Sequence, residues 1–520
     1  MAALVGLGYL LLRNQPELAP GAFADDGVYL GLGQALAAGD GYRSVYAPGA
    51  LPHGKYPPGL PLLHAVLWRL GGALPAVWAL AGGLSLAATA AAGGLLWWLG
   101  RGRLRLPALP LLVLGVCPLL LEGSVQYLQL PVSEPVFLLL AVAALVVWPG
   151  AATSTRAALA TGALLGAAAL IRSQGLLLVA GLLLVFPWRA AGVRRAAALV
   201  GVGLAVLLAG MGVRIAAAGP TRPVEPDELS YLAAGFGGVG EALASAPGTV
   251  LANTMTYAEA LSRHLAGPPL VGGLLLAAFA GLVFVGLPVV VRRHVGLVAA
   301  VAGLGGILLV WPYAQDRFAL ILLPLLGLVA AAGVERLAPR ERAGRAAAAF
   351  VVLLAVTAGV AHHQATLRRA ALEAPPEEAP RWHPAWFLRE NTRYLASASA
   401  WLAEHARPDD RLLAPLPAGL FLLTGLPGAN ATPFEARGRP LFDVPGAYLA
   451  ERIRDQAPTL LLLWGSTYPI TRDAALLQSS CPDVLRYEGS TGPPLGVAVF
   501  RIVPDSCFAD WARSLERSGA

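Results

Sequence analysis

Long apolar stretches alternate with short charged or Pro- and Gly-rich segments from the start of the chain to about residue 361. A helix needs about 20 apolar residues to cross the hydrocarbon core of a bilayer. The pattern therefore predicts about eleven transmembrane helices, several of them short. They cover residues 1–12, 73–99, 106–121, 134–149, 157–171, 175–188, 196–217, 269–291, 295–310, 318–334 and 346–361.

Arginine clusters occupy every second connection between these predicted spans. The clusters hold Arg101, Arg103, Arg105, Arg156, Arg189, Arg194, Arg195, Arg292, Arg293, Arg336, Arg340, Arg342 and Arg345. Because loops rich in Lys and Arg stay in the cytoplasm, all of these connections are predicted to be cytoplasmic. An odd number of spans then places the N-terminus inside the cell and the C-terminal tail outside.

Three longer segments fall on the predicted outer side, and the polar pattern of each differs. Residues 13–72 form a loop, and residues 218–268 are polar enough to fold over the membrane surface. Residues 362–520 begin with a Pro- and Glu-rich linker, which marks a boundary. We therefore expect a transmembrane domain at 1–361 and an extracytoplasmic domain at 362–520.

The tail shows the mixed pattern of a small α/β domain. Residues 391–406 have the apolar spacing of an amphipathic helix, whereas 411–416, 459–465 and 496–503 are short strand-like runs. Cys481 and Cys507 lie in this tail, where an oxidising compartment would allow a disulfide. The chain is thus predicted to be a polytopic α-helical membrane protein with a C-terminal extracytoplasmic α/β domain.

Composition supports a multi-pass protein of the cell membrane. Hydrophobic residues make up 56% of the chain, charged residues only 13%, and the mean hydropathy is +0.63. Soluble domains carry about 25% charged residues, so a soluble enzyme with a single anchor is excluded. The net charge of +7 comes from arginines between apolar stretches, and no basic patch interleaved with aromatic residues suggests nucleic-acid binding.

The first outer loop holds the most informative polar residues. Asp25 and Asp26 are adjacent carboxylates at the start of a predicted helix that includes Tyr29, where acids stabilise the helix end. Lys55 is the only lysine of the chain, although Lys and Arg together number 38. It precedes Tyr56 and a Pro-Pro-Gly turn. Arginine would serve equally well as a snorkelling cation, so this lysine is interpreted as a functional choice.

Five short motifs along the membrane part resemble those of the GT-C superfamily of integral membrane glycosyltransferases, of the protein mannosyltransferase and aminoarabinose transferase type. They are Asp-Asp-x-x-Tyr-Leu (25–30), Lys-Tyr-Pro-Pro-Gly (55–59), Ser-Glu-Pro-Val-Phe (133–137), Ile-Arg-Ser-Gln-Gly (171–175) and Gln-Asp-Arg-Phe-Ala-Leu-Ile-Leu-Leu-Pro (315–324). The resemblance implies an inverting transfer of a hexosyl or pentosyl group from a polyprenyl-phosphate donor. The acceptor would be a glycan, a lipid or a protein on the outer face.

The resemblance also assigns roles to individual residues. Asp25 would be the base that deprotonates the acceptor hydroxyl, with Asp26 as the other candidate, because many relatives carry Asp-Glu here. Lys55 would bind the donor phosphate, whose developing charge needs cations. Further candidates are Arg172, Tyr313 and Arg317 for the phosphate and Tyr29, Tyr56 and Glu134 for the substrate. Asp25 and Asp26 permit a divalent metal without requiring one.

The competing interpretation is a polytopic transporter or flippase of lipid-linked glycans. Transport would need charged or broken helices at the bilayer midplane and a pathway open to both sides. The candidate charges Asp25, Lys55, Glu134, Arg172 and Arg317 are instead all expected at the outer boundary, which favours a transferase.

Overall fold

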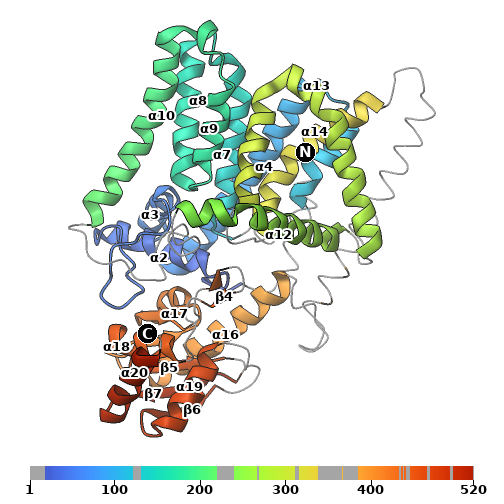
Figure 1. Ribbon diagram of the computed structural model, residues 1–520. Helices are drawn as coiled ribbons and strands as arrows, with labels where there is room; N and C mark the ends of the chain where they lie inside the picture. The colour runs from blue at the N-terminus through green and yellow to red at the C-terminus, as the bar shows by residue number, and fades with distance from the viewer. Residues whose placement is uncertain are drawn as a thin grey trace.

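The computed structural model is a bundle of helices with an α/β part beside one end (Figure 1). The structure describes residues 18–120, 130–218, 239–265, 269–310, 316–337, 366, 370, 384–431, 435–436, 439–440, 446–464, 469–491 and 496–518. The predicted spans at 1–12 and 346–361, and the candidate site residue Tyr313, lie outside these ranges.

Apolar helices of the bundle coincide with most of the predicted spans. They are α4 (Leu74–Trp98), α7 (Ser133–Val147), α8 (Thr155–Ile171), α9 (Gly175–Leu184), α10 (Trp188–Ala218), α13 (Pro269–Val310) and α14 (Asp316–Leu337). Among the described residues, four segments are long and apolar enough to cross a membrane: Leu74–Arg103, Ser133–Gly150, Trp188–Gly212 and Leu270–Val310. A mostly helical architecture with several apolar segments of membrane-spanning length is confirmed, whereas the number of eleven spans stays a prediction.

Two predicted spans meet in α13, and the break between them is visible. His294 has φ −161° and ψ 74°, so the backbone leaves the helical conformation directly after the Arg292-Arg293 pair. Within the span predicted at 106–121, the helix is irregular rather than a continuous α-helix. That segment contains α5 (Ala108–Pro110), the π-helical turn η2 (Leu111–Val116) and the 3₁₀ turn η3 (Cys117–Leu120). Prolines at 107, 110 and 118 lack the backbone N–H that a regular helix needs.

Small residues allow the bundle helices to pack closely. A Cβ atom on Gly286 of α13 would lie 1.9 Å from the carbonyl oxygen of Val329 on α14. A Cβ atom on Gly333 of α14 would lie 2.1 Å from the carbonyl oxygen of Leu282. The glycine-rich spans therefore reflect backbone contact between helices, as is common where lipid removes the hydrophobic drive for association.

The arginine clusters within the described residues gather at one end of the bundle, which we call the arginine end. Arg293 Nη1 lies 2.6 Å from Glu335 Oε2 and donates to the carbonyl oxygen of Leu104 at 2.6 Å. Arg195 donates to the carbonyl oxygen of Ala152 at 2.7 Å. The start of α7, the end of α8 and the start of α14 lie at the opposite end, which we call the site end (Figure 1).

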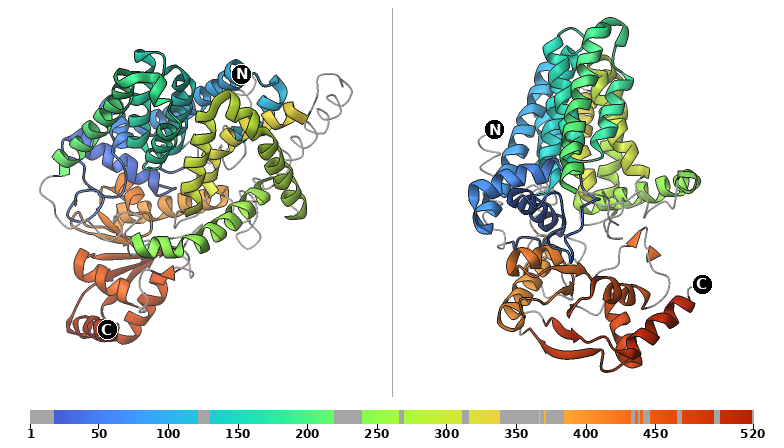
Figure 2. Two further views of the ribbon diagram at one scale, coloured as in Figure 1. Left: turned by 45° about the horizontal axis from the view of Figure 1, so that its top comes forward. Right: turned by 90° about the vertical axis from the view of Figure 1, so that its left-hand side faces the viewer.

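Three helices outside the bundle lie near the site end. The loop predicted at 13–72 contains α2 (Asp25–Ala38) and α3 (Gly59–Gly71), and the segment predicted at 218–268 contains α12 (Val239–Leu265). α12 runs across the bundle rather than along it (Figures 1 and 2). Asn253 of α12 donates to the carbonyl oxygens of Leu308 and Leu309 at 3.1 and 2.9 Å. These bonds satisfy acceptors that the C-terminal turn of α13 leaves open.

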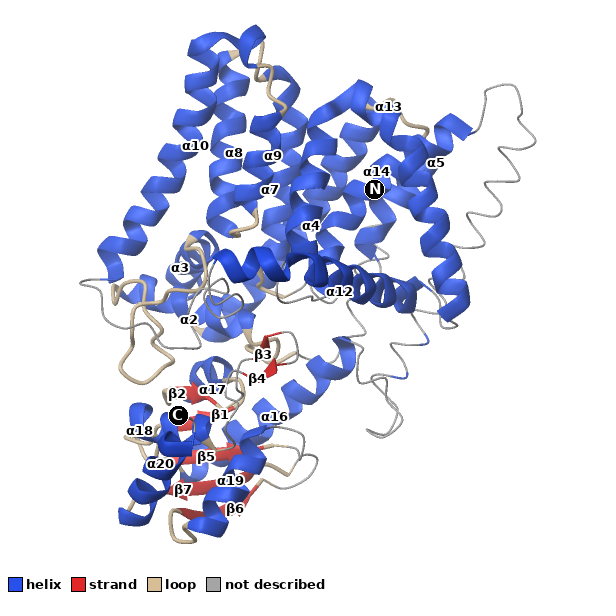
Figure 3. Cartoon of the chain, in the orientation of Figure 1, coloured by secondary structure: helices blue, strands red, loops and turns tan. Residues whose placement is uncertain are grey.

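A five-stranded sheet forms the centre of the α/β part, in the order β2-β1-β5-β7-β6 (Figure 3). The strands are β1 (Leu412–Ala414), β2 (Gly428–Asn430), β5 (Leu460–Leu463), β6 (Leu485–Ser490) and β7 (Ala498–Ile502); β3 (Glu435–Ala436) and β4 (Arg439–Pro440) form a separate pair. β2, β1 and β5 are parallel, and β7 and β6 add antiparallel strands.

Helices cover both faces of this sheet. Leu412 and Leu460 face α16 (Pro384–His405) and α17 (Pro417–Thr424), whereas the alternate residues Leu413 and Leu461 face α18 (Ala447–Gln456), α19 (Pro469–Ser480) and α20 (Ser506–Ser518). The predicted helix at 391–406 and the three predicted strands are confirmed. The expected Cys481–Cys507 disulfide is also present and joins the end of α19 to the start of α20.

One apolar cluster continues from the α/β part into the site end of the bundle. We call it the junction core. Its buried members are Ala22, Leu130, Val132, Leu388, Tyr394, Leu395, Ala398, Leu402, Leu412, Ala414, Leu420, Leu426, Leu460, Leu462, Val497 and Val499. Ala22 precedes α2 and Val132 precedes α7, so the segments that lead into two site helices share a core with the sheet.

Candidate active site

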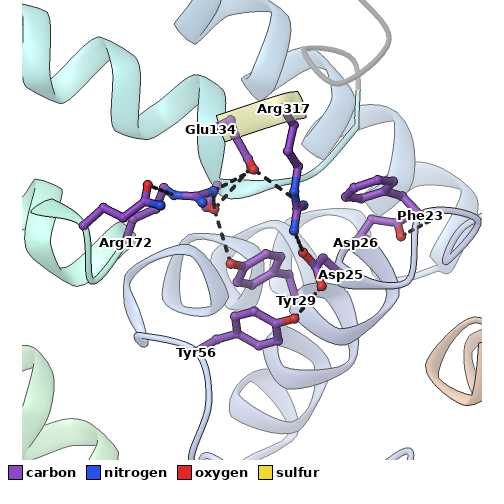
Figure 4. Close-up of polar contacts among 10 residues, drawn as sticks. Phe23, Asp25, Asp26, Tyr29, Tyr56, Glu134, Arg172 and Arg317 are labelled. Atoms are coloured by element: carbon purple, nitrogen blue, oxygen red, sulfur yellow. Dashed lines mark hydrogen bonds and ion pairs between the residues drawn. The ribbon is translucent and has the colours of Figure 1, made fainter. Parts of the chain in front are cut away.

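Asp25 is the first residue of α2 and lies between the bundle and the α/β part. Its Oδ2 atom is 2.5 Å from Arg317 Nη2, and its Oδ1 atom accepts a hydrogen bond from the Tyr56 hydroxyl (Figure 4). Arg317 is the second residue of α14, and Tyr56 lies in the turn before α3. Three segments that are far apart in the chain thus meet at one carboxylate.

Asp26 has different partners, although it is the next residue. Its Oδ2 accepts from the Gly21 amide at 2.9 Å and its Oδ1 from the Phe23 amide at 3.1 Å. The side chain is fully buried. Asp25 therefore faces the charged residues of the bundle, whereas Asp26 binds the backbone of the preceding turn.

Glu134 connects two arginines on the bundle side of Asp25. Its Oε1 atom lies 2.7 Å from Arg172 Nη1 and 3.5 Å from Arg317 Nη1. Arg172 Nη1 also donates to Ser133 Oγ at 2.7 Å, and the Tyr29 hydroxyl donates to the same oxygen at 3.3 Å. The first turn of α7, the end of α8 and the start of α14 therefore form a continuous polar network at the site end.

Aromatic rings surround the arginines of this network. The Arg317 guanidinium carbon lies 4.6 Å from the Phe23 ring centroid and 5.0 Å from that of Phe318. The Arg172 guanidinium carbon is 5.2 Å from the same Phe318 ring. Cations are attracted to ring faces at such distances, and the rings limit the directions in which the guanidinium groups can turn.

Lys55 approaches the network from the turn before α3. Its Nζ atom lies 5.1 Å from the ring centroid of Tyr56, which donates to Asp25. Hydrogen bonds inside the loop hold this turn: the Tyr56 amide donates to His53 Nε2 at 3.1 Å, and the Tyr42 hydroxyl donates to the Tyr56 carbonyl at 2.9 Å. The lysine is therefore presented by a hydrogen-bonded loop.

The two aspartates differ in pKa because their surroundings differ. Burial raises the pKa of Asp25, but the Arg317 guanidinium, the Lys55 ammonium and the Tyr56 hydrogen bond outweigh it, so the pKa lies below the usual carboxyl value. Burial raises the pKa of Asp26 to about 7 despite the backbone hydrogen bonds, and the charge of Asp25 adds to the increase. Burial also raises the pKa of Tyr29. At neutral pH, Asp25 is thus ionised, whereas Asp26 is near the midpoint of its titration.

The structure brings most of the candidate residues together. Those in one connected network are Asp25, Tyr29, Lys55, Tyr56, Glu134, Arg172 and Arg317. Asp26 adjoins the network but faces the turn at 21–23.

Three further residues contact the network but were not predicted from the sequence as site residues: Phe23, Ser133 and Phe318. Ser133 and Phe318 lie inside motifs that were already recognised, so their position next to Glu134 and Arg317 was an available signal. Phe23 had none, because only the turn at 21–23 brings its ring to Arg317.

A divalent cation at Asp25 and Asp26 stays a prediction. Within the described ranges, no three His, Cys, Asp or Glu side chains are grouped so that they could hold a metal ion. Each carboxylate oxygen of the pair already accepts a hydrogen bond from the protein, so the donor set is a poor fit for a resident metal.

The bundle and the adjoining α/β part share their overall fold with solved structures of ArnT, which confirms a mostly helical protein with a small C-terminal sheet. No protein-family model matches the chain, and no curated protein matches its sequence. Two solved structures are similar along nearly the whole chain. ArnT from Cupriavidus metallidurans bound to undecaprenyl phosphate has a TM-score of 0.54 and 15% identity, and the match covers 97% of this chain and 98% of that chain. The apo state of ArnT from Cupriavidus metallidurans has a TM-score of 0.52 and 14% identity over 92% and 94%.

Proposed function

We propose that the protein is an inverting membrane glycosyltransferase that moves a hexosyl or pentosyl group from a polyprenyl-phosphate donor to an acceptor hydroxyl outside the cytoplasm. The observation that carries the proposal is the ion pair of Asp25 with Arg317 in a network that also contains Lys55, Arg172 and Glu134. Undecaprenyl phosphate bound to a protein of the same fold supports a polyprenyl-phosphate ligand.

The charges of the network match such a donor. Three cations, Lys55, Arg172 and Arg317, face two carboxylates, Asp25 and Glu134, which leaves an excess of one positive charge. A sugar joined to a lipid through a phosphodiester carries one negative charge. The bound phosphodiester would therefore neutralise the network, and burial of the site would not leave an uncompensated charge.

Donor binding prepares the base. The donor phosphate competes with the Asp25 carboxylate for the Arg317 guanidinium. Lys55 provides a second cation, and its compact ammonium differs in shape from the planar guanidinium of an arginine. Loss of the Arg317 contact raises the pKa of Asp25 towards a value suited to a general base. An oxygen of the Asp25 carboxylate can then accept the proton of the acceptor hydroxyl.

Sugar transfer follows in one displacement. The acceptor oxygen forms a bond to the anomeric carbon from the face opposite the phosphate, and Asp25 takes its proton. The bond between the anomeric carbon and the phosphate oxygen breaks, and its electron pair stays on that oxygen. The product phosphate gains a negative charge as Asp25 becomes neutral, so a dianionic lipid phosphate faces three cations and the Glu134 carboxylate.

The remaining residues hold the substrate. Glu134 and Tyr29 lie next to the arginines and bear groups that can hydrogen-bond sugar hydroxyls, and Tyr56 contacts the base directly. Tyr313 stays a predicted phosphate ligand. Asp26 is assigned a structural role because its oxygens bind the turn at 21–23, which leaves Asp25 as the base.

Two features favour a transferase on the outer face over a transporter. The network lies at the site end, where α7 and α14 begin and α8 ends, rather than halfway along the bundle. The arginine-rich turns lie at the opposite end, which the positive-inside rule assigns to the cytoplasm. The same rule places the α/β part outside the cell membrane, beside the site.

Binding of undecaprenyl phosphate, with undecaprenol as the uncharged control, tests the donor half of the proposal. We expect the phosphate to raise the melting temperature of the purified protein in nanodiscs, and undecaprenol to do so much less. At a hundred times Kd the expected stabilisation is about 2.7 kcal/mol. Lys55→Ala should weaken the effect, and the exposed Arg69→Ala should not. Equal stabilisation by both lipids would overturn the phosphate site.

Transfer itself is tested with radiolabelled undecaprenyl-phosphate sugars and membrane fractions as acceptors. We expect the wild type to move label from the donor to a product, and Asp25→Asn to lower the rate by about 100-fold or more. No donor consumed by the wild type, across a panel of hexoses and pentoses, would contradict a transferase. Full activity of Asp25→Asn would contradict the assignment of the base.

A further inference from the structure

A turn between the bundle and the α/β part carries the residues that precede Asp25. Asn391 of α16 donates to the carbonyl oxygen of Ala22 at 2.6 Å, and both residues are buried. The neighbouring Thr392 accepts a hydrogen bond from the Ala19 amide at 3.3 Å. The backbone at 19–22 is therefore bonded to a helix more than 360 residues later in the chain.

A close backbone contact holds the same turn from a second helix. Gly21 has φ +88°, and a Cβ atom placed on it would lie 2.2 Å from the Cα atom of Gly419 on α17. Asp26 binds the Gly21 amide from the other side. α16, α17 and α2 thus enclose the turn.

The backbone of the turn is strained where it enters α2. Ala24 has φ 69° and ψ −62°, a region that residues with a side chain rarely adopt. Such a conformation costs on the order of 1–3 kcal/mol and persists only where surrounding contacts enforce it. Contacts from α16, α17 and Asp26 of α2 surround the turn, and Ala24 is directly followed by Asp25.

The turn reaches the charged network at two points. Phe23 packs against the Arg317 guanidinium, and Asp25 forms an ion pair with it. Glu134, the second carboxylate of the network, follows a segment that packs in the junction core. Leu130 and Val132 of that core lie just before Ser133 and Glu134. Both carboxylates of the network therefore follow segments that pack against the α/β part.

We infer that Asn391 is a positioning residue for the transfer reaction: through the carbonyl of Ala22 it sets the turn that places Phe23 and Asp25 against Arg317. The α/β part thereby completes the active site without contributing a group that touches the reacting atoms. This role rests on the proposed transferase function.

Kinetics of Asn391→Ala and Asn391→Asp test this role. The aspartate keeps the shape of asparagine but replaces the donor by an acceptor, so the Ala22 carbonyl loses its bond in both variants. Leu402→Ala serves as the control for stability. Leu402 is also buried on α16 in the junction core, but lies 11 residues further along, at about 1.5 Å per residue.

We expect both Asn391 variants to lower kcat about tenfold at a nearly unchanged donor KM, since a small misplacement of a catalytic group is costly. The acidic limb of kcat/KM should move to higher pH, because a looser contact with Arg317 releases the Asp25 carboxyl. The other charged groups that face it, Lys55, Glu134, Arg172 and Asp26, are unchanged. Leu402→Ala should lower the melting temperature without either kinetic change.

Wild-type kinetics and pH profile in the Asn391 variants, at whatever melting temperature, would overturn the positioning role while leaving the transferase intact. Kinetic changes of equal size in Leu402→Ala would also overturn it, because general destabilisation would then explain them. Absence of transfer by the wild type is a separate outcome that contradicts the proposed function. In that case, hydrogen exchange at residues 19–30 tests whether Asn391 holds the turn before α2. Equal exchange rates in the wild type and Asn391→Ala would show that it does not.

Discussion

Arg317 Nη2 lies 2.5 Å from Asp25 Oδ2, although 292 residues separate the two in the chain. The pair joins the first residue of α2 to the first turn of α14, and Phe23 covers its guanidinium. In this arrangement the Asp25 carboxylate, the proposed base, is engaged in an ion pair with Arg317. The mechanism therefore depends on an exchange of partners.

Replacement of Arg317 by lysine keeps the charge but removes the planar fork. We expect Arg317→Lys to lower kcat/KM by about 100-fold, because one ammonium cannot contact both Asp25 and Glu134 as the guanidinium does. Arg336→Lys, at the exposed end of the same helix, is the matched control and should stay within about twofold. Similar losses in the two variants would contradict a special role for Arg317.

The pH dependence should differ between kcat/KM and kcat. Asp25 must be ionised to accept a proton, so activity is lost as the pH falls through its pKa. In the free enzyme that pKa lies below the usual carboxyl value, so the acidic limb of kcat/KM should also lie below the usual carboxyl range. With donor bound, Arg317 contacts phosphate, so the limb of kcat should lie at higher pH. Coinciding limbs would argue against the exchange of partners.

Stability should decrease with pH because of Asp26. Its pKa rises from 3.8 to about 7 on folding, so between these values the folded state binds more protons than the unfolded state. The free energy of unfolding then falls as the pH rises through this window and levels off above it. From pH 4 to pH 8, the melting temperature of the wild type should fall more steeply than that of Asp26→Asn, which cannot titrate at this position. Parallel curves would show that Asp26 is not the cause.

Lys55 should not be replaceable by arginine without loss. The turn at 53–56 presents a single compact ammonium above Tyr56, and a longer planar guanidinium would have to displace the hydrogen-bonded loop. We expect Lys55→Met to weaken undecaprenyl phosphate binding by more than tenfold and Lys55→Arg to have an intermediate effect. Calorimetric titration of the lipid phosphate measures both. Wild-type affinity in Lys55→Arg would show that only charge matters.

The Cys481–Cys507 disulfide should stabilise the α/β part. It closes a loop with a sequence separation of 26 residues, which corresponds to about 3.5 kcal/mol of unfolded-state entropy. The double variant Cys481→Ser/Cys507→Ser should melt at a lower temperature than the wild type. Because reductant should mimic the double variant, an unchanged melting curve under reduction would refute this stabilising role.

Charged residues at the edges of apolar stretches made much of the site predictable. Glu134, Arg172 and Arg317 all flank predicted spans, and alternation of the spans brings such edges to one end of a bundle. The break at His294 was predictable for the same reason, since two arginines interrupt the apolar run before it. Hydrophobic periodicity and charge are read from neighbouring residues, and these features depend only on neighbouring residues, so the sequence could predict them.

Other features depend on contacts that no local pattern records. The bond from Asn391 to Ala22 crosses 369 positions, and the contact of Gly21 with Gly419 needs both helices in place. β2 has only three residues, Gly428–Asn430, and pairs with β1 on one side. β6 is an edge strand whose middle residues are exposed, so it lacks the apolar signal of β1 and β5. The division between Asp25 and Asp26 also required the folded turn, because adjacent identical side chains carry no distinguishing pattern.

The junction core has a consequence for how such a chain can be rearranged. Ala22, Leu130 and Val132 belong to the same buried cluster as the inner face of the sheet. Separating the transmembrane part from the α/β part would expose the apolar residues that each buries against the other. Replacing the sheet by a foreign one would place mismatched side chains against the segments before α2 and α7. The α/β part is consequently not an interchangeable module, and its sequence and that of the first loop have to change together.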